Sequence, residues 1–574
     1  MKIIYRGRHG YRSNPLPAEA GDVIELLYNN WDDYGYVTSF PTSTRINGVE
    51  VALSTLKLLV ADQRNTGVHL QSLLDAGWDG VFPIPDTDYV SVPSEIEFYE
   101  QLIGLLGREG ALQVAHILRD ASVMSQWEGD PAARALTETD GFTLSLQRER
   151  GAMKAFSDVW KLFTDQSVEV VDVDFRFRDV FDQISTVQLK FQAASSLPHD
   201  INVLIGPNGV GKSRILLSLV EDWISPSMTG EVGFTPDPSF SQIVVVSYSP
   251  FEDFPIDLVG QALREGDVYR YFGFRGRGEP NLRDEPHGVD RPGEIELSHD
   301  FPKINAARSL IECLADDKRY GDIEDWPNKI RTAEAVLRTA IDFDVIAVAV
   351  APETNLFELA DLFGAGAAAL AFLTGDDEER YLPLTGGAGD PVHMERLSQA
   401  VLADRGVGFF REGRQIHLSS GQRLFAYIVI NILGAIKRNS LILVDEPELF
   451  LHPTLEIQFV EMLKTILARL TSKALLATHS VVTVREMPSD CVHVLERTAE
   501  GLVIKQPPFQ TFAGDIQRIA SYVFGDRAKS KPHEAWIKER LAALGSADAL
   551  LAELGEDLNE ELVIRIRAME AGRW

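Results

Sequence analysis

The segment Ile201-Asn-Val-Leu-Ile-Gly206-Pro-Asn-Gly-Val-Gly-Lys-Ser213 joins a short apolar run to a glycine-rich loop, and a helical pattern follows over Arg214–Ile224. A continuous apolar run suits a strand that is buried on both faces of a parallel sheet. The loop matches G-x-x-x-x-G-K-S, whose backbone amides form a concavity for phosphate at a helix N-terminus. We therefore predict that Lys212 reaches the β- and γ-phosphates of a nucleotide and that Ser213 ligates Mg²⁺. The residues predicted to bind the nucleotide here are Asn208, Gly209, Gly211, Lys212, Ser213 and Arg214.

A second apolar run, Leu441-Ile-Leu-Val-Asp445-Glu446, ends in two carboxylates. Phosphoryl transfer needs charge neutralisation and a positioned water more than covalent chemistry. We expect Asp445 to hold Mg²⁺ and Glu446 to orient or deprotonate the attacking water. Taken alone, the pair could be an acidic cap for the next helix. Together with the phosphate loop, it predicts a site for ATP and Mg²⁺.

The stretch Leu418-Ser-Ser-Gly-Gln-Arg423 opens the apolar helix predicted over Leu424–Ile436. Its hydroxyls and amides therefore point from a helix N-terminus toward an anion. The stretch resembles the L-S-G-G-Q signature of ABC-type ATPases, with Ser420 in place of the first glycine. In that family the signature contacts the γ-phosphate of ATP held by another copy, which implies a head-to-tail homodimer or a higher even oligomer. The resemblance assigns this contact to Ser419, Ser420, Gly421 and Gln422.

The order of the motifs is also that of the ABC-type family, because a histidine follows the Asp-Glu pair. His479, in Leu475-Leu-Ala-Thr-His-Ser480, corresponds to the catalytic switch histidine that senses the γ-phosphate. The stretch Asp445-Glu-Pro-Glu-Leu-Phe-Leu-His452-Pro453 is similar to the soluble chromosome and defence branch of the family. That branch includes RecF-like and SMC-like repair ATPases, OLD-family proteins and the PtuA ATPase of Septu-type anti-phage systems. The resemblance covers roughly residues 187–524 and is tight in the quoted motifs.

One position departs from the family pattern. ABC proteins usually carry a glutamine after the strand that follows the phosphate loop, as a Mg²⁺ ligand and lid contact. Here that strand runs into Ser247-Tyr-Ser-Pro-Phe-Glu-Asp253. Ser247, Ser249 or Glu252 could substitute, and the sequence leaves the choice open.

The predicted fold class is α/β, with an ABC-ATPase-type P-loop core at residues 166–525. A mostly helical lobe interrupts this core at about 251–408. Residues 1–165 are predicted to form an N-terminal α+β domain for sensing or docking, and residues 526–574 a short helical tail. The expected core strands are Ile201–Ile205, Ser241–Val246, Ser440–Val444 and Ala474–Ala477, and a helix is expected over Thr454–Leu470. In the N-terminal domain we expect strands within 22–29, 33–46 and 48–60, and helices at 94–106 and 111–124.

Composition excludes several classes of protein. The 574 residues include 55 Lys and Arg and 85 Asp and Glu, and the net charge of −30 argues against a protein that coats nucleic acid or anionic membrane with its whole surface. The two cysteines, Cys313 and Cys491, rule out a disulfide framework and favour a cytoplasmic protein. The longest apolar stretches, Leu362–Gly375 and Leu424–Ile436, are shorter than the ~18 residues that a membrane span needs, so no membrane partner is expected.

Two segments, Tyr5–Arg12 and Tyr269–Arg277, interleave aromatic residues with arginine and could contact nucleic acid. Exposed turns with scattered charge would give the same pattern.

The sequence favours a Mg²⁺-dependent ATP hydrolase that dimerises through ATP and regulates a separate effector in prokaryotic anti-phage defence. No nuclease motif is visible in the chain, and the resemblance implies a co-encoded effector such as an HNH-type nuclease. The alternative is a RecF-like DNA repair or maintenance ATPase that binds DNA itself. A third possibility is the nucleotide-binding half of a transporter. The residues His452-Pro453 do not resemble the corresponding sequence of transporter ATPase subunits.

Overall fold

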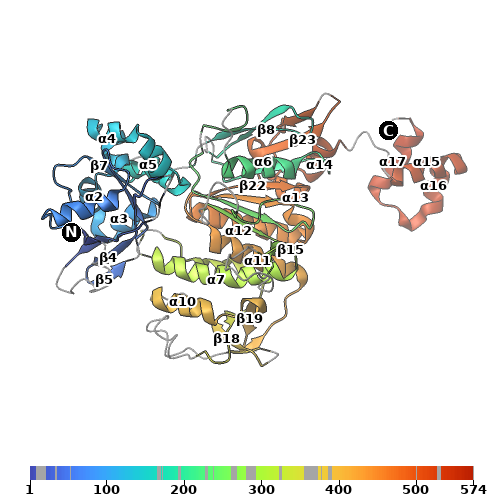
Figure 1. Ribbon diagram of the computed structural model, residues 1–574. Helices are drawn as coiled ribbons and strands as arrows, with labels where there is room; N and C mark the ends of the chain where they lie inside the picture. Colours follow the sequence, from blue (N-terminus) through green and yellow to red (C-terminus); the bar gives the residue numbers. More distant parts are fainter. Residues whose placement is uncertain are drawn as a thin grey trace. The chain divides into compact units, whose positions relative to one another are not determined.

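The computed structural model of the protein describes residues 1–7, 21–30, 32, 35–51, 53–164, 170, 172–191, 196–225, 230–236, 238–259, 268–278, 293–321, 323, 326–354, 373–375, 378–384, 391–499, 501–525 and 532–572. The chain packs into two compact units, Met1–Phe512 and Ala513–Trp574 (Figure 1). All the nucleotide motifs lie in the larger unit. The domain limits predicted near residues 165 and 525 stay predictions.

A seven-stranded sheet forms the centre of the larger unit, in the order β13-β12-β21-β22-β10-β23-β24. Neighbouring strands are parallel except for β23 and β24. The strands are β10 Ile201–Ile205, β12 Ile243–Ser247, β13 Tyr269–Gly273, β21 Leu441–Asp445, β22 Lys473–Thr478, β23 Val492–Arg497 and β24 Leu502–Lys505. The predicted parallel core is confirmed, and the four predicted strands lie within one or two residues of their expected ends.

Helices cover both faces of this sheet. Figure 1 shows α6 (Lys212–Ile224) and α12 (Pro453–Arg469) on opposite sides of it. The α6 face packs Leu216, Leu219 and Trp223 against alternate residues of the strands, such as Val245 and Leu443. Residues at the intervening positions of β12 and β21 are also buried, which explains why these two strands are nearly continuous apolar runs.

A small antiparallel sheet, β11-β8-β9, lies beside this core and shares its hydrophobic cluster. Its strands are β8 Val173–Arg178, β9 Ile184–Leu189 and β11 Gly233–Thr235.

The N-terminal residues form an α+β arrangement with a hydrophobic cluster of their own. Two sheets, β1-β2-β4-β5 and β3-β6-β7, are present. The predicted helices 94–106 and 111–124 are joined in α3, which is broken at Gly107 with φ 72° and ends at Leu118, and the last residues of the second prediction begin η2. The elements are β1 Lys2–Tyr5, β2 Val23–Leu26, β3 Ser39–Phe40, β4 Thr42–Ile46, β5 Val49–Val51, β6 Leu56–Val60, α2 Thr66–Asp75, β7 Tyr89–Pro93, α3 Glu97–Leu118, η2 Ser122–Trp127, α4 Pro131–Thr137, η3 Phe142–Leu146 and α5 Arg150–Leu162.

The lobe expected to be mostly helical is mixed in its described residues. Alongside its helices lie a five-stranded antiparallel sheet, β17-β18-β16-β19-β20, and a two-stranded one, β14-β15. The larger sheet extends past residue 408 to Gln415, whereas β13, inside the predicted range, belongs to the core sheet. Strands of two to five residues are too short to show a clear alternation of apolar and polar side chains, so these strands were not predicted from the sequence. The elements are β14 Arg275–Arg277, β15 Ile295–Leu297, α7 Asp300–Arg319, α8 Lys329–Leu337, β16 Val345–Ala349, β17 Leu373–Thr374, β18 Arg380–Pro383, α10 Pro391–Ala400, η5 Ala403–Arg405, β19 Val407–Arg411 and β20 Arg414–Gln415.

The apolar run Leu362–Gly375 lies outside the described residues except for its last three, of which two form β17.

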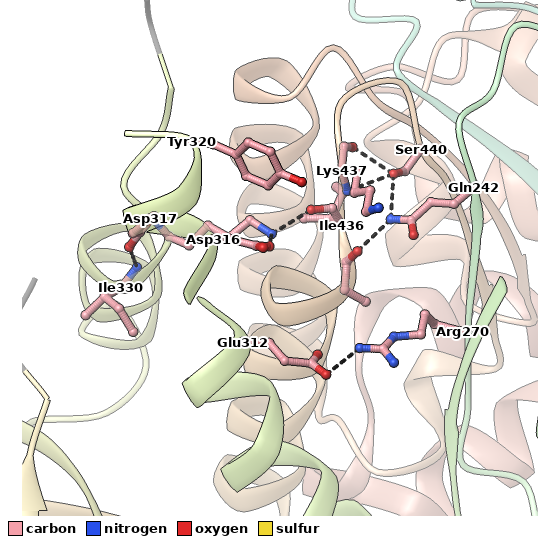
Figure 2. A network of polar contacts seen from close by, with 12 residues as sticks. Gln242, Arg270, Glu312, Asp316, Asp317, Tyr320, Ile330, Ile436, Lys437 and Ser440 are labelled. Atoms are coloured by element: carbon pink, nitrogen blue, oxygen red, sulfur yellow. Dashed lines mark hydrogen bonds and ion pairs between the residues drawn. The ribbon is translucent and has the colours of Figure 1, made fainter. Parts of the chain in front are cut away.

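Helix α11 (Ser420–Ala435) carries the signature stretch at its N-terminus, and its residues from Leu424 to Ala435 are buried. It packs so closely on α7 that a Cβ at Gly434 would lie 2.5 Å from the Cβ of Ser309. Figure 2 shows the polar contacts at its C-terminal end. There the Gln242 side chain donates to the Ala435 carbonyl at 2.6 Å, and Lys329 Nζ donates to the Ile436 carbonyl at 2.7 Å. These donors satisfy carbonyls that the helix itself leaves without partners.

The remaining elements complete the two units. In the larger unit they are η6 Pro447–Leu449, α13 Val481–Arg485 and η7 Ser489–Cys491. The smaller unit is helical, with α14 Ile516–Phe524, α15 Pro532–Leu544, α16 Ala547–Leu554, η8 Gly555–Asp557 and α17 Glu560–Glu570. Residues Ile537, Leu550 and Ile566 form its core.

Candidate functional site

The glycine-rich loop lies between β10 and α6, where two glycines are required. A Cβ at Gly206 would lie 2.5 Å from the Leu495 carbonyl oxygen of β23, so the backbones approach too closely for any side chain. Gly211 caps α6 with φ 107°, a conformation that other residues rarely adopt. The loop therefore turns directly into the helix N-terminus, the geometry that presents backbone amides to an anion. Asn208 and Gly209 are exposed at its tip, and the Arg214 side chain pairs with Glu221 at 3.7 Å.

Lys212 is only 4% exposed and lies under the loop. Its Nζ donates to the Gly206 carbonyl at 3.2 Å and lies 2.7 Å from His479 Nε2. Burial lowers the pKa of Lys212, while the nearby carboxylates of Glu446 and Asp445 oppose the shift. Its ammonium thus sits at the edge of the sheet, among acidic groups and beside the loop.

Asp445, at the end of β21, meets Ser213, at the start of α6. The Ser213 hydroxyl donates to Asp445 Oδ1 at 2.9 Å. Oxygen ligands about 2.1 Å from Mg²⁺ at right angles lie about 3.0 Å apart, so these two oxygens have the spacing of neighbouring ligands. Burial, together with the negative charges of Glu446 and Glu448, raises the pKa of Asp445 to about 7. A buried carboxylate of this kind is stabilised by a cation, and the pair fits Mg²⁺.

Glu446 and His479 complete the arrangement from two neighbouring strands. Glu446 adopts left-handed backbone angles (φ 49°), and its N–H donates to the Ala477 carbonyl of β22 at 2.8 Å. Its carboxylate lies 3.3 Å from His479 Nε2, and this hydrogen bond lowers the pKa of Glu446. One ring nitrogen cannot accept from Lys212 and donate to Glu446 at once. His479 therefore has two alternative partners, one on each side.

The signature stretch is placed apart from these groups. Ser419 is the N-cap of α11 and forms a capping box with Gln422, at 3.3 Å and 3.2 Å. The Gln422 side chain also donates to the Ala340 carbonyl at 3.1 Å. Ser419 and Ser420 are exposed, and Gly421 is half-buried against the Phe450 carbonyl. Within the described part of one chain, no hydrogen bond joins this stretch to Gly206–Ser213, whereas Lys212, Ser213, Asp445, Glu446 and His479 are brought together.

The three candidates for the missing lid glutamine differ in their surroundings. Glu252 is engaged with the Tyr271 hydroxyl and with Arg275, at 3.2 Å from the guanidinium. Ser249 accepts from the Phe251 N–H at 3.4 Å. Ser247 is fully buried, pairs in register with Asp445, and its Oγ has no hydrogen-bond partner within the described residues. Among the three candidates, Ser247 is therefore the one that neighbours Asp445 in the sheet and has an oxygen without a hydrogen-bond partner.

Sequence reasoning missed two carboxylates near His479. Glu448 accepts a hydrogen bond from the His479 backbone N–H, and Glu456 accepts one from the Ser480 hydroxyl. The third acidic residue in Asp445-Glu-Pro-Glu448 was the available signal for Glu448.

Other candidate sites receive less support. Arg275 and Arg277 of the segment Tyr269–Arg277 pair with Glu252 and Asp257, so they already have acidic partners. Most of the segment Tyr5–Arg12 lies outside the described residues.

A third group, His199, Asp490 and Cys491, has metal-ligating side chains close together. The two ring nitrogens of His199 lie 2.7 Å from the Leu197 carbonyl and 3.0 Å from Asp490, so both have hydrogen-bond partners without a metal.

Among the described residues, no helix has the length and apolar character that crossing a membrane requires.

The parallel sheet, the phosphate loop after β10 and the acidic pair after β21 define a mixed α/β protein with a P-loop ATPase core. Comparison with known proteins agrees with this class. Residues 415–485 match the family model described as "AAA domain, putative AbiEii toxin, Type IV TA system". The matched residues include the signature stretch, the acidic pair and His479.

Two individual proteins are similar to the chain. Protein ea59 of Escherichia phage lambda is 23% identical over 544 residues, which cover 91% of this chain and 89% of ea59. The SMC head domain from Thermotoga maritima is 12% identical, with a TM-score of 0.23, and the alignment covers 59% of this chain and 100% of that domain.

Proposed function

We propose that the chain is a Mg²⁺-dependent ATPase that closes as a head-to-tail dimer around ATP and regulates a separate effector. The observation that carries the ATPase proposal is the convergence of Lys212, Ser213, Asp445, Glu446 and His479 at one edge of the parallel sheet. Each has a role in phosphoryl transfer: Lys212 neutralises the phosphates, Ser213 and Asp445 hold Mg²⁺, and Glu446 positions the water. Bound Mg²⁺ supplies charge neutralisation between the phosphates and the protein.

His479 links phosphate binding to Glu446 in this proposal. A triphosphate attracts Lys212 away from the imidazole, because phosphate is the stronger partner of an ammonium group. Nε2 of His479 is then available to donate to Glu446, which lies 3.3 Å away. The carboxylate that orients the water is thus held in place when the nucleotide is bound.

Exposure of the signature stretch supports the dimer. Its hydroxyls lie at a helix N-terminus and have no phosphate loop of their own chain as a partner. A second copy that supplies its phosphate loop gives these groups a γ-phosphate to bind.

Regulation of an effector in anti-phage defence is the finer part of the proposal. It is supported by the resemblance of Asp445–Pro453 to defence ATPases. The description of the matched family model names a toxin of a toxin–antitoxin system. The similar protein ea59 is a phage protein. Purification of the chain with its genomic neighbours tests this part: a co-purifying nuclease supports it, and salt-sensitive DNA binding by the chain alone favours the RecF-like alternative.

Hydrolysis of ATP by the purified protein tests the ATPase proposal. Wild type should release phosphate with Mg²⁺, Lys212→Ala should lose nucleotide binding, and Glu446→Gln should bind ATP without turnover. The matched controls, Lys538→Ala and Glu461→Gln, change exposed residues and should retain turnover. Absence of turnover in the wild type, or full turnover in Glu446→Gln, contradicts the proposal.

Complementation between inactive copies tests the dimer. Copies with Lys212→Ala keep their signature, and copies with Ser420→Arg keep their phosphate loop. A mixture should regain activity, because one composite site per mixed dimer is intact. A mixture that stays inactive, together with a sedimentation profile of Glu446→Gln that ATP leaves unchanged, argues against the dimer.

A further inference from the structure

Glu448 lies in the short turn η6, two residues after Glu446. Its Oε1 accepts a hydrogen bond from the backbone N–H of His479, which follows the neighbouring strand β22. A carboxylate that accepts from a backbone amide fixes the position of that peptide more firmly than a neutral acceptor does. Glu448 thus ties the start of the segment after β22 to the segment after β21.

The next residue of this segment, Ser480, makes contacts of its own. The Ser480 hydroxyl donates to Glu456 of α12 and accepts from the backbone N–H groups of Val482 and Thr483, at 3.2 Å and 3.3 Å. Ser480 is therefore both the N-cap of α13 and a contact to α12. With Glu448 on one side and Glu456 on the other, the backbone at His479 has little freedom to move.

The second oxygen of Glu448 is unusual. Oε2 is buried and has no hydrogen-bond partner within the described residues. A buried carboxylate oxygen without a partner costs stability, so stability alone does not explain Glu448.

We propose that Glu448 is a positioning residue for the nucleotide site, and that its hydrogen bond to the His479 backbone sets the imidazole between Lys212 and Glu446. This inference rests on the proposed ATPase function and deepens it. His479 Nε2 lies 2.7 Å from Lys212 Nζ and 3.3 Å from the Glu446 carboxylate, and both distances depend on where the backbone holds the ring.

Two variants at position 448 test the role in turnover. Glu448→Ala removes the acceptor and should lower kcat by roughly 10-fold or more while leaving KM for ATP within about 2-fold. Glu448→Gln keeps an oxygen that can accept from the amide and should retain most of the turnover. Glu461→Ala, an exposed residue of α12, is the control for loss of a carboxylate. Thermal unfolding of each variant checks that it is folded.

A double variant separates positioning from direct catalysis. If Glu448 acts through the imidazole, Glu448→Ala should cost nothing further in a His479→Ala background. The inference is overturned if Glu448→Ala turns over ATP like the wild type, if Glu448→Gln is as impaired as Glu448→Ala, or if the two losses multiply.

Hydrogen exchange provides a measurement that does not depend on turnover. The His479 amide should exchange on the order of 10-fold faster in Glu448→Ala than in the wild type or Glu448→Gln, because its acceptor is gone. Unchanged exchange overturns the inference. A wild type without turnover would instead contradict the ATPase proposal, so the two failures are distinguishable.

Discussion

Two partly buried clusters of charge in the larger unit differ in whether acidic and basic groups are equal in number. At the nucleotide edge, three acidic groups, Asp445, Glu446 and Glu448, lie near one buried ammonium, that of Lys212. Where the N-terminal α+β part meets the core, acids and bases are matched. Lys437 pairs with Glu95 at 2.8 Å, and Arg438 pairs with Glu100 at 3.3 Å.

The difference shows what each cluster is for. A matched set of ion pairs holds two parts of a protein together and leaves no charge for a ligand. An excess of buried carboxylates is unfavourable for the folded protein until a cation binds, and it therefore marks a binding site. In this protein, the cluster with excess carboxylates is the candidate nucleotide site. The cluster with matched charges joins the N-terminal part to the core.

One carboxylate of the matched cluster is an exception. Glu97, at the start of α3, is 4% exposed and lines a polar cavity of about 420 Å³ together with Glu95 and Lys437. Burial, together with the charges of Glu95 and Glu100, raises the pKa of Glu97 to about 7. This residue allows the comparison to be tested within the matched cluster itself.

The largest expected effect is at the nucleotide edge. Asp445→Asn should lower Mg²⁺-dependent ATP turnover by roughly 100-fold, because the amide cannot supply the charge that holds the metal. In buffer without Mg²⁺ its melting temperature should not fall, since the substitution removes a carboxylate whose ionised form is disfavoured by burial and by Glu446 and Glu448. Parallel assays of turnover and thermal unfolding check both parts. A destabilised but active variant would reverse our assignment of this cluster.

Loss of stability without loss of turnover is expected for an acidic residue of the matched cluster. Asp158 of α5 accepts from Lys154 at 3.0 Å and from Lys161 at 2.7 Å, and both side chains of the Lys154–Asp158 pair are at most 3% exposed. Asp158→Asn leaves a buried ammonium without its counter-charge and should destabilise the protein by about 3 kcal/mol. Turnover per folded molecule should stay at the wild-type level. Denaturant unfolding beside an exposed control, Asp140→Asn, measures the change.

The destabilisation caused by Asp158→Asn should depend on pH in a defined direction. Burial would raise the pKa of Asp158, but Lys154 and Lys161 hold it below its ordinary value. A lowered pKa in the folded state stabilises the protein above the ordinary carboxyl range. The gap between wild type and Asp158→Asn should therefore persist at neutral pH and narrow as the pH falls below about 4. A constant gap would mean that charge pairing is not the cause.

The smallest effect is expected at Glu97. Because the pKa is raised to about 7 in the folded state, the folded protein binds this proton more tightly than the unfolded chain does. Wild type should therefore lose stability as the pH rises through 7, whereas Glu97→Gln should not. We expect the variant to melt about 1–2 °C higher at pH 8 and at the same temperature as wild type at pH 5. A variant that melts lower at pH 8 would show that ionised Glu97 belongs to the matched set.

The parallel core was predictable because its physical cause is local. Strands buried on both faces must be continuous apolar runs, and the polar loops that follow them mark their carboxyl ends. Lys212, Ser213, Asp445 and His479 could be named for this reason. The antiparallel sheet of the lobe was not predictable, since strands as short as Leu373–Thr374 carry too few residues to show a period.

The site residues that were missed depend on strand order. Glu448 and His479 are 31 residues apart, and they meet because β21 and β22 are neighbours in the sheet. The choice among Ser247, Ser249 and Glu252 depends on the same kind of fact, because Ser247 pairs in register with Asp445. Neither contact has a signal in the spacing of residues along the chain.

The amino-acid order alone is thus enough to define the phosphate loop, the strands around it and the acidic pair, because each depends on neighbours within about ten residues. The partners of each charged side chain were settled by the folded arrangement, since strand order and helix packing bring distant carboxylates and amines together. That arrangement places Asp445 beside Glu446 and Glu448, ties His479 to Glu448, and pairs Lys437 with Glu95. Charge balance is a property of contacts in space, and a linear pattern of residues does not contain it.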